Sequence, residues 1–173
     1  MNSRAKGASF ELLVAKMILK AAGLDKKHCY RTPLSGGHAQ YSKDMPGDLF
    51  ISDDLFDLFP FVVEAKHNKT WKPGVMLYPR KQEQAWMAQV TRDTARAWSS
   101  GRPDASPFLV MRGNGTEIFA ATPYFSETAL WDATPYLVYT WKGDVWIMVS
   151  FSTALHELEK RVAARVKGGL TRK

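Results

Sequence analysis

The sequence predicts a single α/β domain in which a mixed central β-sheet is flanked by helices. Its 173 residues are the length of one compact domain. Its apolar fraction of 45% is enough for a buried core. Helical and strand-like periodicities alternate along it, in the order helix, strands, helix, strands, helix.

The first predicted element is a helix over residues 4–22, ended by Gly23. Its apolar residues fall at helical spacing and form one stripe: Phe10, Leu13, Val14, Met17, Ile18 and Ala21. Glu11 lies about 100° around the helix from Phe10. We therefore expect Glu11 at the edge of the stripe, where its carboxylate can face a groove while the helix packs on the core.

Short strands are predicted next, separated by segments rich in Gly, Ser and Pro. The expected strands are 28–31, 48–52 and 61–66, and the expected irregular segments are 32–46, a turn at 53–54, and 68–80. The run Phe61-Val62-Val63-Glu64-Ala65-Lys66 is apolar and β-branched until it ends in charge. This pattern is typical of a buried central strand.

The second half of the chain continues the alternation. It contains an expected helix at 81–99, a hairpin of 107–111 with 116–121, a hairpin of 136–141 with 145–151, a helix at 153–166, and a basic tail. Trp131, Trp141 and Trp146 are expected in the core or at an interface rather than on a base-stacking surface. We treat 1–173 as one domain, in which 122–173 have no assigned role beyond a possible dimerisation surface.

Composition narrows the class of function. The formal net charge is +7, from 24 Lys and Arg against 17 Asp and Glu, which favours a polyanionic partner. No apolar run approaches the roughly 18 residues of a membrane span, and the first residues lack a secretory signal, so we expect a cytoplasmic protein without membrane contact. The single cysteine excludes a cysteine-rich zinc site.

Glu64 and Lys66 are the residues that indicate chemistry. Two positions apart on a strand, their side chains share a face and lie roughly 6.5 Å apart along it. Alone, the pair also fits a strand end that emerges into solvent. Asp48, however, follows Gly47 at the start of another strand, and pairing of the two strands would bring it beside Glu64. Two carboxylates and the Ala65 carbonyl would make an oxygen-rich site for a hard cation such as Mg²⁺.

Lys66 would then sit next to a water bound by the cation. It would orient that water, help to deprotonate it, or stabilise charge on a phosphate. Glu11 would complete the acidic cluster from the first helix, directly or through water.

The order of motifs resembles a known superfamily. Asp48 with Glu64-x-Lys66 resembles the PD-(D/E)xK nucleases. The surrounding motifs are Lys6-Gly7-x-x-Phe10-Glu11, Arg31-Thr32-Pro33-Leu34-Ser35-Gly36-Gly37, Trp86-Met87-Ala88-Gln89 and Pro107-Phe108-Leu109-Val110. Their order resembles the Holliday-junction resolvases of the archaeal type and their bacteriophage-encoded relatives, over residues 4–121.

The resemblance implies a restriction-endonuclease-like core and a role for individual residues. The implied catalytic residues are Glu11, Asp48, Glu64, Lys66, Ser35 and Gln89, with Glu11, Asp48, Glu64 and Ala65 at the metal. The implied DNA contacts are Arg4, Lys6, Arg31, Ser35 and Lys43. For Gln89 an ordinary exposed helix residue, and for Arg4, Lys6 and Arg31 a solvated charge, remain equal alternatives.

The same resemblance implies a homodimeric, Mg²⁺-dependent endodeoxyribonuclease in which Mn²⁺ can substitute. Two active centres would nick a four-way junction symmetrically, in the host cytoplasm if the protein is phage-encoded. Two alternatives remain open. One is another nuclease of the same fold, of the nicking, repair or restriction type; the other is a DNA-binding domain without catalysis.

Overall fold

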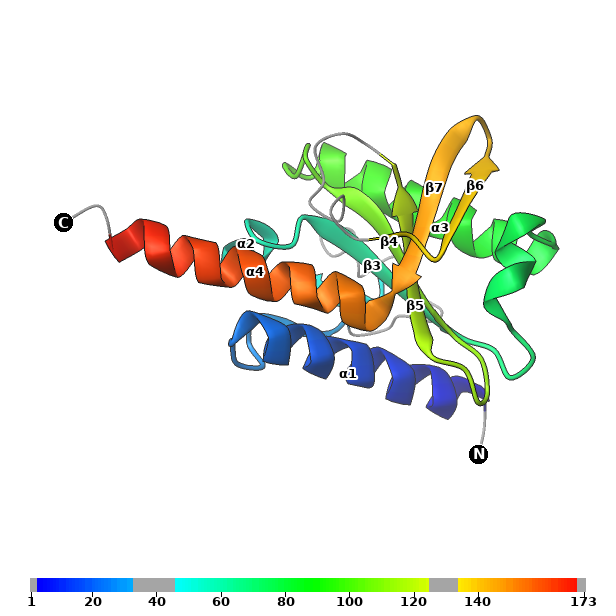
Figure 1. The fold of residues 1–173 in the computed structure, drawn as a ribbon, viewed down its shortest axis with the longest axis horizontal. Coiled ribbons are helices and arrows are strands. Elements are labelled where there is room, and N and C mark those ends of the chain that lie inside the picture. The colour runs from blue at the N-terminus through cyan, green and yellow to red at the C-terminus, as the bar shows by residue number, and fades with distance from the viewer. Residues whose placement is uncertain (1–2, 33–45, 125–133, 171–173) are drawn as a thin grey trace.

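The computed structural model describes residues 3–32, 46–124 and 134–170. Its helices are α1 (Ser3–Ala22), α2 (Asp53–Phe56), α3 (Lys81–Ser99) and α4 (Phe151–Leu170), with a short 3-10 helix, η1 (Pro73–Leu77). Its strands are β1 (Cys29–Arg31), β2 (Leu49–Ile51), β3 (Phe61–His67), β4 (Ser106–Arg112), β5 (Ile118–Pro123), β6 (Leu137–Trp141) and β7 (Asp144–Ser150). The predicted α/β fold, a mixed sheet flanked by helices, is confirmed (Figure 1).

The main sheet has five strands in the order β3-β4-β5-β7-β6. Strands β3 and β4 are parallel and are connected through α3, whereas every other neighbouring pair is antiparallel. The two hairpins that the sequence predicts are β4 with β5 and β6 with β7. Strand β3 therefore lies at an edge of the sheet, where one side of its backbone is open to other segments.

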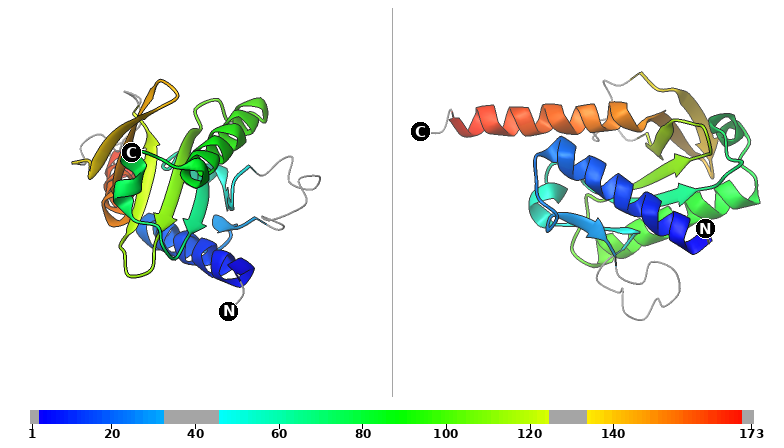
Figure 2. Two further views of the ribbon diagram at one scale, coloured as in Figure 1. Left: turned by 90° about the vertical axis from the view of Figure 1, so that its right-hand side faces the viewer. Right: turned by 90° about the horizontal axis from the view of Figure 1, so that it is seen from below.

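Helices cover both faces of this sheet. Because side chains alternate along β3, successive residues of this strand point to opposite faces. Val63 and Ala65 belong to a core cluster built with α1 and α4. Glu64 and Lys66 project to the opposite face, where α3 packs. Figure 2 shows the sheet between α3 on one side and α1 and α4 on the other. The charged pair thus lies beneath α3 rather than in solvent.

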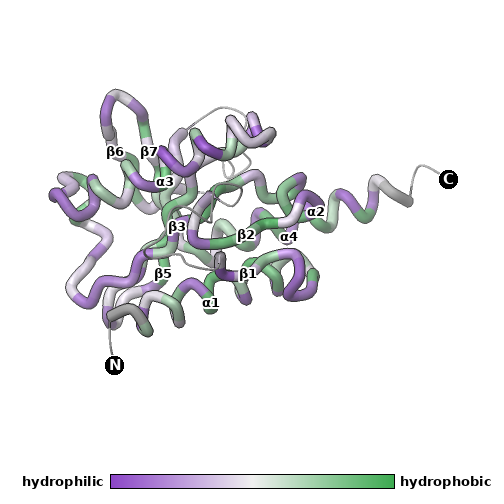
Figure 3. Tube along the Cα trace, turned by 180° about the vertical axis from the view of Figure 1, so that it is seen from behind, coloured by the Kyte–Doolittle hydropathy of each residue, from purple (hydrophilic) through white to green (hydrophobic). Residues whose placement is uncertain are grey.

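The predicted pairing of the strands that carry Asp48 and Glu64 is wrong in one respect. Strand β2 pairs antiparallel with β1 in a separate two-stranded sheet, and not with β3. Asp48, just before β2, still meets β3, because its N–H donates to the Val63 carbonyl at 2.9 Å. In the view from behind, β1 and β2 lie beside the open edge of β3 (Figure 3).

Helix α1 buries a wider face than its apolar stripe predicts. It packs on β1 and β3 and also on α4, so Ala15, Leu19 and Ala22 are buried as well. Glu11 consequently lies inside the buried face, only 7% exposed, rather than at its edge. Leu13, which the stripe includes, is exposed.

Two further boundaries differ from the prediction. The expected turn at 53–54 is instead the start of α2, where the Ser52 side chain accepts a hydrogen bond from the Leu55 N–H as an N-cap. Two acidic residues in this first turn suit the positive end of the helix dipole. Helix α4 extends to Leu170 and takes in part of the expected basic tail.

Trp141 and Trp146 are both buried in a second core cluster on the α3 face, in agreement with the core assignment, whereas Trp131 lies outside the described residues. Among the helices that the structure describes, none has the length and apolar character to cross a membrane.

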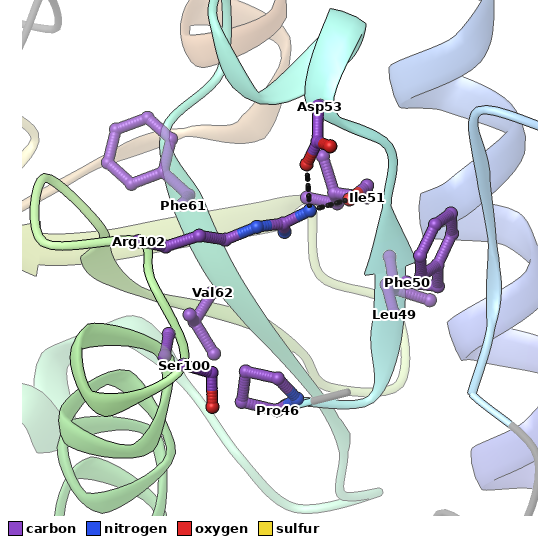
Figure 4. Close-up of a pocket in the computed structure, with 10 residues that line it drawn as sticks. Pro46, Leu49, Phe50, Ile51, Asp53, Phe61, Val62, Ser100 and Arg102 are labelled. Atoms are coloured by element: carbon purple, nitrogen blue, oxygen red, sulfur yellow. Dashed lines mark hydrogen bonds and ion pairs between the residues drawn. The ribbon is translucent and has the colours of Figure 1, made fainter. Parts of the chain in front are cut away.

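Arg102 fastens the small sheet to the main one. It follows α3 and lines an open pocket of about 210 Å³ between β2, the start of β3 and the end of α3 (Figure 4). Its guanidinium donates to the Ile51 carbonyl at 2.8 Å and to the Asp53 carboxylate at 2.7 Å. It also lies 4.7 Å from the centre of the Phe56 ring. The position of β2, and so of Asp48, depends on this side chain.

We predict that Arg102→Ala lowers the free energy of unfolding by about 1.5–3 kcal/mol, the usual contribution of a hydrogen bond from a charged group. Asp53→Ala is the matched control and should cost much less, because that side chain is 95% exposed and surface ion pairs contribute little. Urea unfolding of both variants measures the difference. If both variants lose the same free energy of unfolding, the stabilisation comes from the exposed ion pair with Asp53 and not from the hydrogen bond to the Ile51 carbonyl.

Candidate active site

Three charged side chains meet at the end of β3. The Lys66 ammonium donates to Glu64 Oε2 at 2.6 Å and to Asp48 Oδ2 at 3.4 Å. Glu64 is 1% exposed and Asp48 6% exposed. Glu64 and Lys66 lie on one face of the strand, as the two-residue spacing requires. One ammonium therefore bridges two buried carboxylates.

Asp48 reaches this cluster from outside the main sheet, along the open edge of β3. Its backbone N–H donates to the Val63 carbonyl, and its Oδ2 accepts from the Ala65 N–H at 2.9 Å. The N–H and carbonyl of one strand residue point to the same side. The Ala65 carbonyl therefore also faces the edge where Asp48 lies.

Gly47 is what permits this close approach. Its φ is +90°, in the region that favours glycine. A Cβ at this position would lie 2.8 Å from the Val63 carbonyl oxygen. Any side chain would push the chain away from β3 and move Asp48 with it.

Helix α3 supplies the other wall of the site. Gln89 Nε2 donates to Glu64 Oε2 at 2.9 Å, so this residue is a partner of Glu64 and not an ordinary exposed helix residue. Asp93, one turn further along, is 6% exposed, and its proximity contributes to the raised pKa of Glu64. Sequence reasoning missed Asp93, although an acid four residues after Gln89 on a helix face that carries Val90 and Ala97 is a usable signal.

The surroundings shift the proton affinities of both central groups. Burial raises the pKa of Glu64 well above its ordinary value of 4.5, and the nearby Asp48 charge raises it further. Burial alone would lower the pKa of Lys66, but the charges of Glu64 and Asp48 outweigh it and raise that pKa above 10.5. Lys66 is therefore a charged donor, and Glu64 is a carboxyl group of raised proton affinity.

The donor set fits a hard divalent cation. A positive charge, the Lys66 ammonium, is already held between the two carboxylates, which marks the place as one that stabilises cations. The donors are carboxylate oxygens and the Ala65 carbonyl, and Mg²⁺ is usually bound through one or two carboxylates with water completing its shell. Within the described ranges, no group of three or more His, Cys, Asp or Glu side chains forms a metal site.

Glu11 is not brought into a three-acid cluster with Asp48 and Glu64 in the described part of the chain. It forms an ion pair with Arg31 instead, because both lie where α1 packs on β1. Arg31 is opposite Leu49 in the register of the small sheet, next to Asp48. A role for Glu11 at the metal, directly or through water, remains a proposal.

The other residues named from the resemblance are placed only in part. Lys6 is half-buried in α1. Arg4 lies in the first turn of α1, and its side chain is outside the described part of the structure. Ser35 and Lys43 also lie outside the described residues.

We predict that Gly47→Ala lowers stability by roughly 1–3 kcal/mol, the usual cost of a strained backbone position, and lowers divalent-metal affinity because Asp48 is displaced. Gly74→Ala is the control, since a Cβ there meets no atom within 4 Å. Calorimetry with Mg²⁺ and thermal unfolding measure the two effects. A Gly47→Ala protein that binds metal like the wild type would contradict the role given to this close approach.

A second prediction follows from the raised pKa of Glu64. A raised pKa in the folded state contributes stability that is complete below the unfolded value of 4.5 and is lost as pH rises through the folded value. Glu64→Gln lacks this loss. In the presence of a chelator, the variant should therefore gain on the wild type in free energy of unfolding as pH rises from 4.5, and urea titrations at several pH values would reveal a constant difference if the site were not proton-linked.

Comparison with known proteins agrees with this geometry. The model of a family described as "Phage putative PDDEXK endonuclease" matches residues 2–160, most of the chain. No curated protein and no solved structure gives a significant match. The matched span contains Asp48, the Glu64-Ala65-Lys66 triplet and both core clusters. The chain therefore belongs to this phage PDDEXK endonuclease family.

Proposed function

We propose that the protein is a divalent-metal-dependent endodeoxyribonuclease whose active site is the cluster at the open edge of β3. One observation carries the proposal. Two buried carboxylates, Asp48 and Glu64, share one ammonium from Lys66, in the strand arrangement that gives the superfamily its name. Burial of these charges is costly, because each carboxylate or ammonium group loses on the order of several kcal/mol of hydration. Charges that are kept buried at such a cost are expected to serve a function.

Each residue has a distinct part in this proposal. Asp48, Glu64 and the Ala65 carbonyl are the groups that would hold the cation, which we take to be Mg²⁺. When bound, such a cation supplies Lewis-acid chemistry at the scissile phosphate. Gln89 holds Glu64 in orientation through its 2.9 Å hydrogen bond. Loss of a residue that orients a metal ligand in this way typically lowers metal affinity or activity by about 10- to 100-fold.

Lys66 acts as a donor. Its ammonium lies 2.6 Å from Glu64 Oε2 and 3.4 Å from Asp48 Oδ2, so it would stabilise negative charge on the phosphate or orient the attacking water.

The substrate that we propose is a four-way DNA junction, cut by a homodimer with two symmetric nicks. Support comes from the order of motifs over residues 4–121, which resembles the archaeal-type resolvases, and from the net charge of +7. A dimer is needed because the described part of each chain carries one such cluster and two opposed strands must be cut.

We predict that the purified protein nicks a synthetic four-way junction in Mg²⁺ and leaves a matched linear duplex largely intact. A chelator should stop the reaction, and Mn²⁺ should restore it. Sequence-specific cleavage of the duplex with no action on the junction would replace this substrate by a restriction-type one, and the nuclease assignment itself would stand.

The matched variants are Glu64→Ala and Lys66→Ala. The first should abolish cleavage, and the second should lower it by roughly 10²- to 10³-fold, as loss of a charge-stabilising donor does elsewhere. Both should still bind the junction in gel shifts. Lys27→Ala, an exposed lysine on the loop after α1, should cleave like the wild type. Cleavage by Glu64→Ala at the wild-type rate would overturn the proposed site.

A further inference from the structure

The connection between β3 and α3 borders the candidate site at both ends. We name residues 68–81 the connecting segment. It begins two residues after Lys66 and ends eight residues before Gln89. In the view from behind, it is hydrophilic at both ends, with a short apolar piece at η1 between them (Figure 3). A ligand of this segment would therefore contact residues that are close in sequence to both Lys66 and Gln89.

The connecting segment carries an excess of exposed positive charge. Residues 65–103 are all described, and the only acids among them, Glu83 and Asp93, are buried. The exposed cations of the same stretch are Lys69, Lys72, Arg80, Lys81 and Arg92. One exposed acid, Glu117, lies on the β4–β5 turn, which contacts the segment through the hydrogen bond from Asn114 N–H to the Lys69 carbonyl. An excess of exposed cations attracts a polyanion and is the usual electrostatic footprint of nucleic-acid binding.

An aromatic ring stands among these cations. Tyr78 is 87% exposed, the highest value among the exposed large apolar and aromatic side chains that the structure describes. The backbone that carries it is anchored, because Met76 and Trp71 are buried. Trp71 is in turn pressed against the β4–β5 turn, where a Cβ on Gly113 would lie 2.0 Å from its carbonyl oxygen. The ring is thus presented to solvent by an anchored segment.

A small hollow lies at the base of the segment. It has a volume of about 90 Å³ and is lined by Asn68, Thr70, Trp71, Val75, Arg80, Gln82 and Glu83. Asn68 Nδ2 donates to Gln82 Oε1 at 3.0 Å, so this wall is fixed between β3 and α3. The Glu83 carboxylate accepts from the Arg80 backbone N–H at 3.1 Å. The exposed Arg80 guanidinium is the group here that suits a phosphate oxygen.

We propose that the connecting segment binds an unpaired stretch of a DNA strand, with Tyr78 stacked on a base and the lysines and Arg80 on the phosphates. An exposed aromatic ring with flanking cations is the combination that single-strand binding uses. In an intact duplex the faces of the bases are covered by their neighbours, so Tyr78 finds a base only where pairing is broken. This inference rests on the proposed nuclease function and adds that the segment reads bases that are unpaired at a branch, as in a splayed fork or in a junction whose branch point has opened.

The test compares three DNAs in a chelator, so that no cleavage occurs: a single strand, a splayed fork and a blunt duplex of equal length. Tyr78→Ala should weaken binding of the single strand and the fork by about 5- to 150-fold, the range expected for loss of one stacked base, and leave the duplex nearly unchanged. Tyr78→Phe should bind like the wild type. A 2-aminopurine placed at the branch should be quenched by the wild type and by Tyr78→Phe only.

Two controls separate stacking from charge and from damage to the fold. Tyr124→Ala removes a tyrosine of similar exposure, 58%, at the opposite end of β5, and should leave all three affinities unchanged. Lys72→Gln should weaken the binding of all three DNAs. It should also lower the slope of log binding constant against log salt concentration by roughly 0.7–0.9, whereas Lys27→Gln should change neither.

Equal losses for Tyr78→Ala on the duplex and the fork, or no loss on either, would overturn the inference. A protein that shows the Tyr78 effect on the single strand but cuts no junction would keep the inference and overturn the junction substrate. If the wild type cuts junctions but Tyr78→Ala binds the single strand and the fork like the wild type, the junction substrate stands and the inference is overturned.

Discussion

Two hydrogen bonds between Asp48 and the open edge of β3 hold the candidate site together. The backbone N–H of Asp48 reaches the Val63 carbonyl, and its carboxylate receives the Ala65 N–H. These contacts join a two-stranded sheet to a five-stranded one without extending the ladder between them. The position of the acid relative to Glu64 is thus set by backbone groups, which tolerate little variation in distance or angle.

The buried charges of the site destabilise the folded state, and this cost is offset by stabilising contacts elsewhere in the domain. Glu64 is almost fully enclosed, and Asp93, Gln89 and Lys66 all converge on it. An ion pair taken out of water seldom stabilises a fold by itself. The compensation lies in the two apolar clusters on either face of the sheet, one under α1 and α4 and the other under α3.

The sequence predicts the fold and part of the site because the local signals are strong. The end of α3 at Ser99 follows from the stop signals Gly101 and Pro103, and the triplet Glu64-Ala65-Lys66 stands out at the end of an apolar strand. The pairing of β2 could not be predicted, because a three-residue strand has no pattern that chooses between β1 and β3. Glu11 shows a second limit. It lies where α1 packs on β1 and pairs there with Arg31, a contact twenty residues away that the stripe of α1 by itself does not predict.

The edge position of β3 has a consequence for how such a protein survives in a crowded cell. A long apolar strand at the border of a sheet invites pairing with another chain and hence aggregation. Here part of that border is occupied by Asp48, so the residue that serves the chemistry also shields the strand. The requirement to cover a strand edge and the requirement to bind a cation then fall on the same residue.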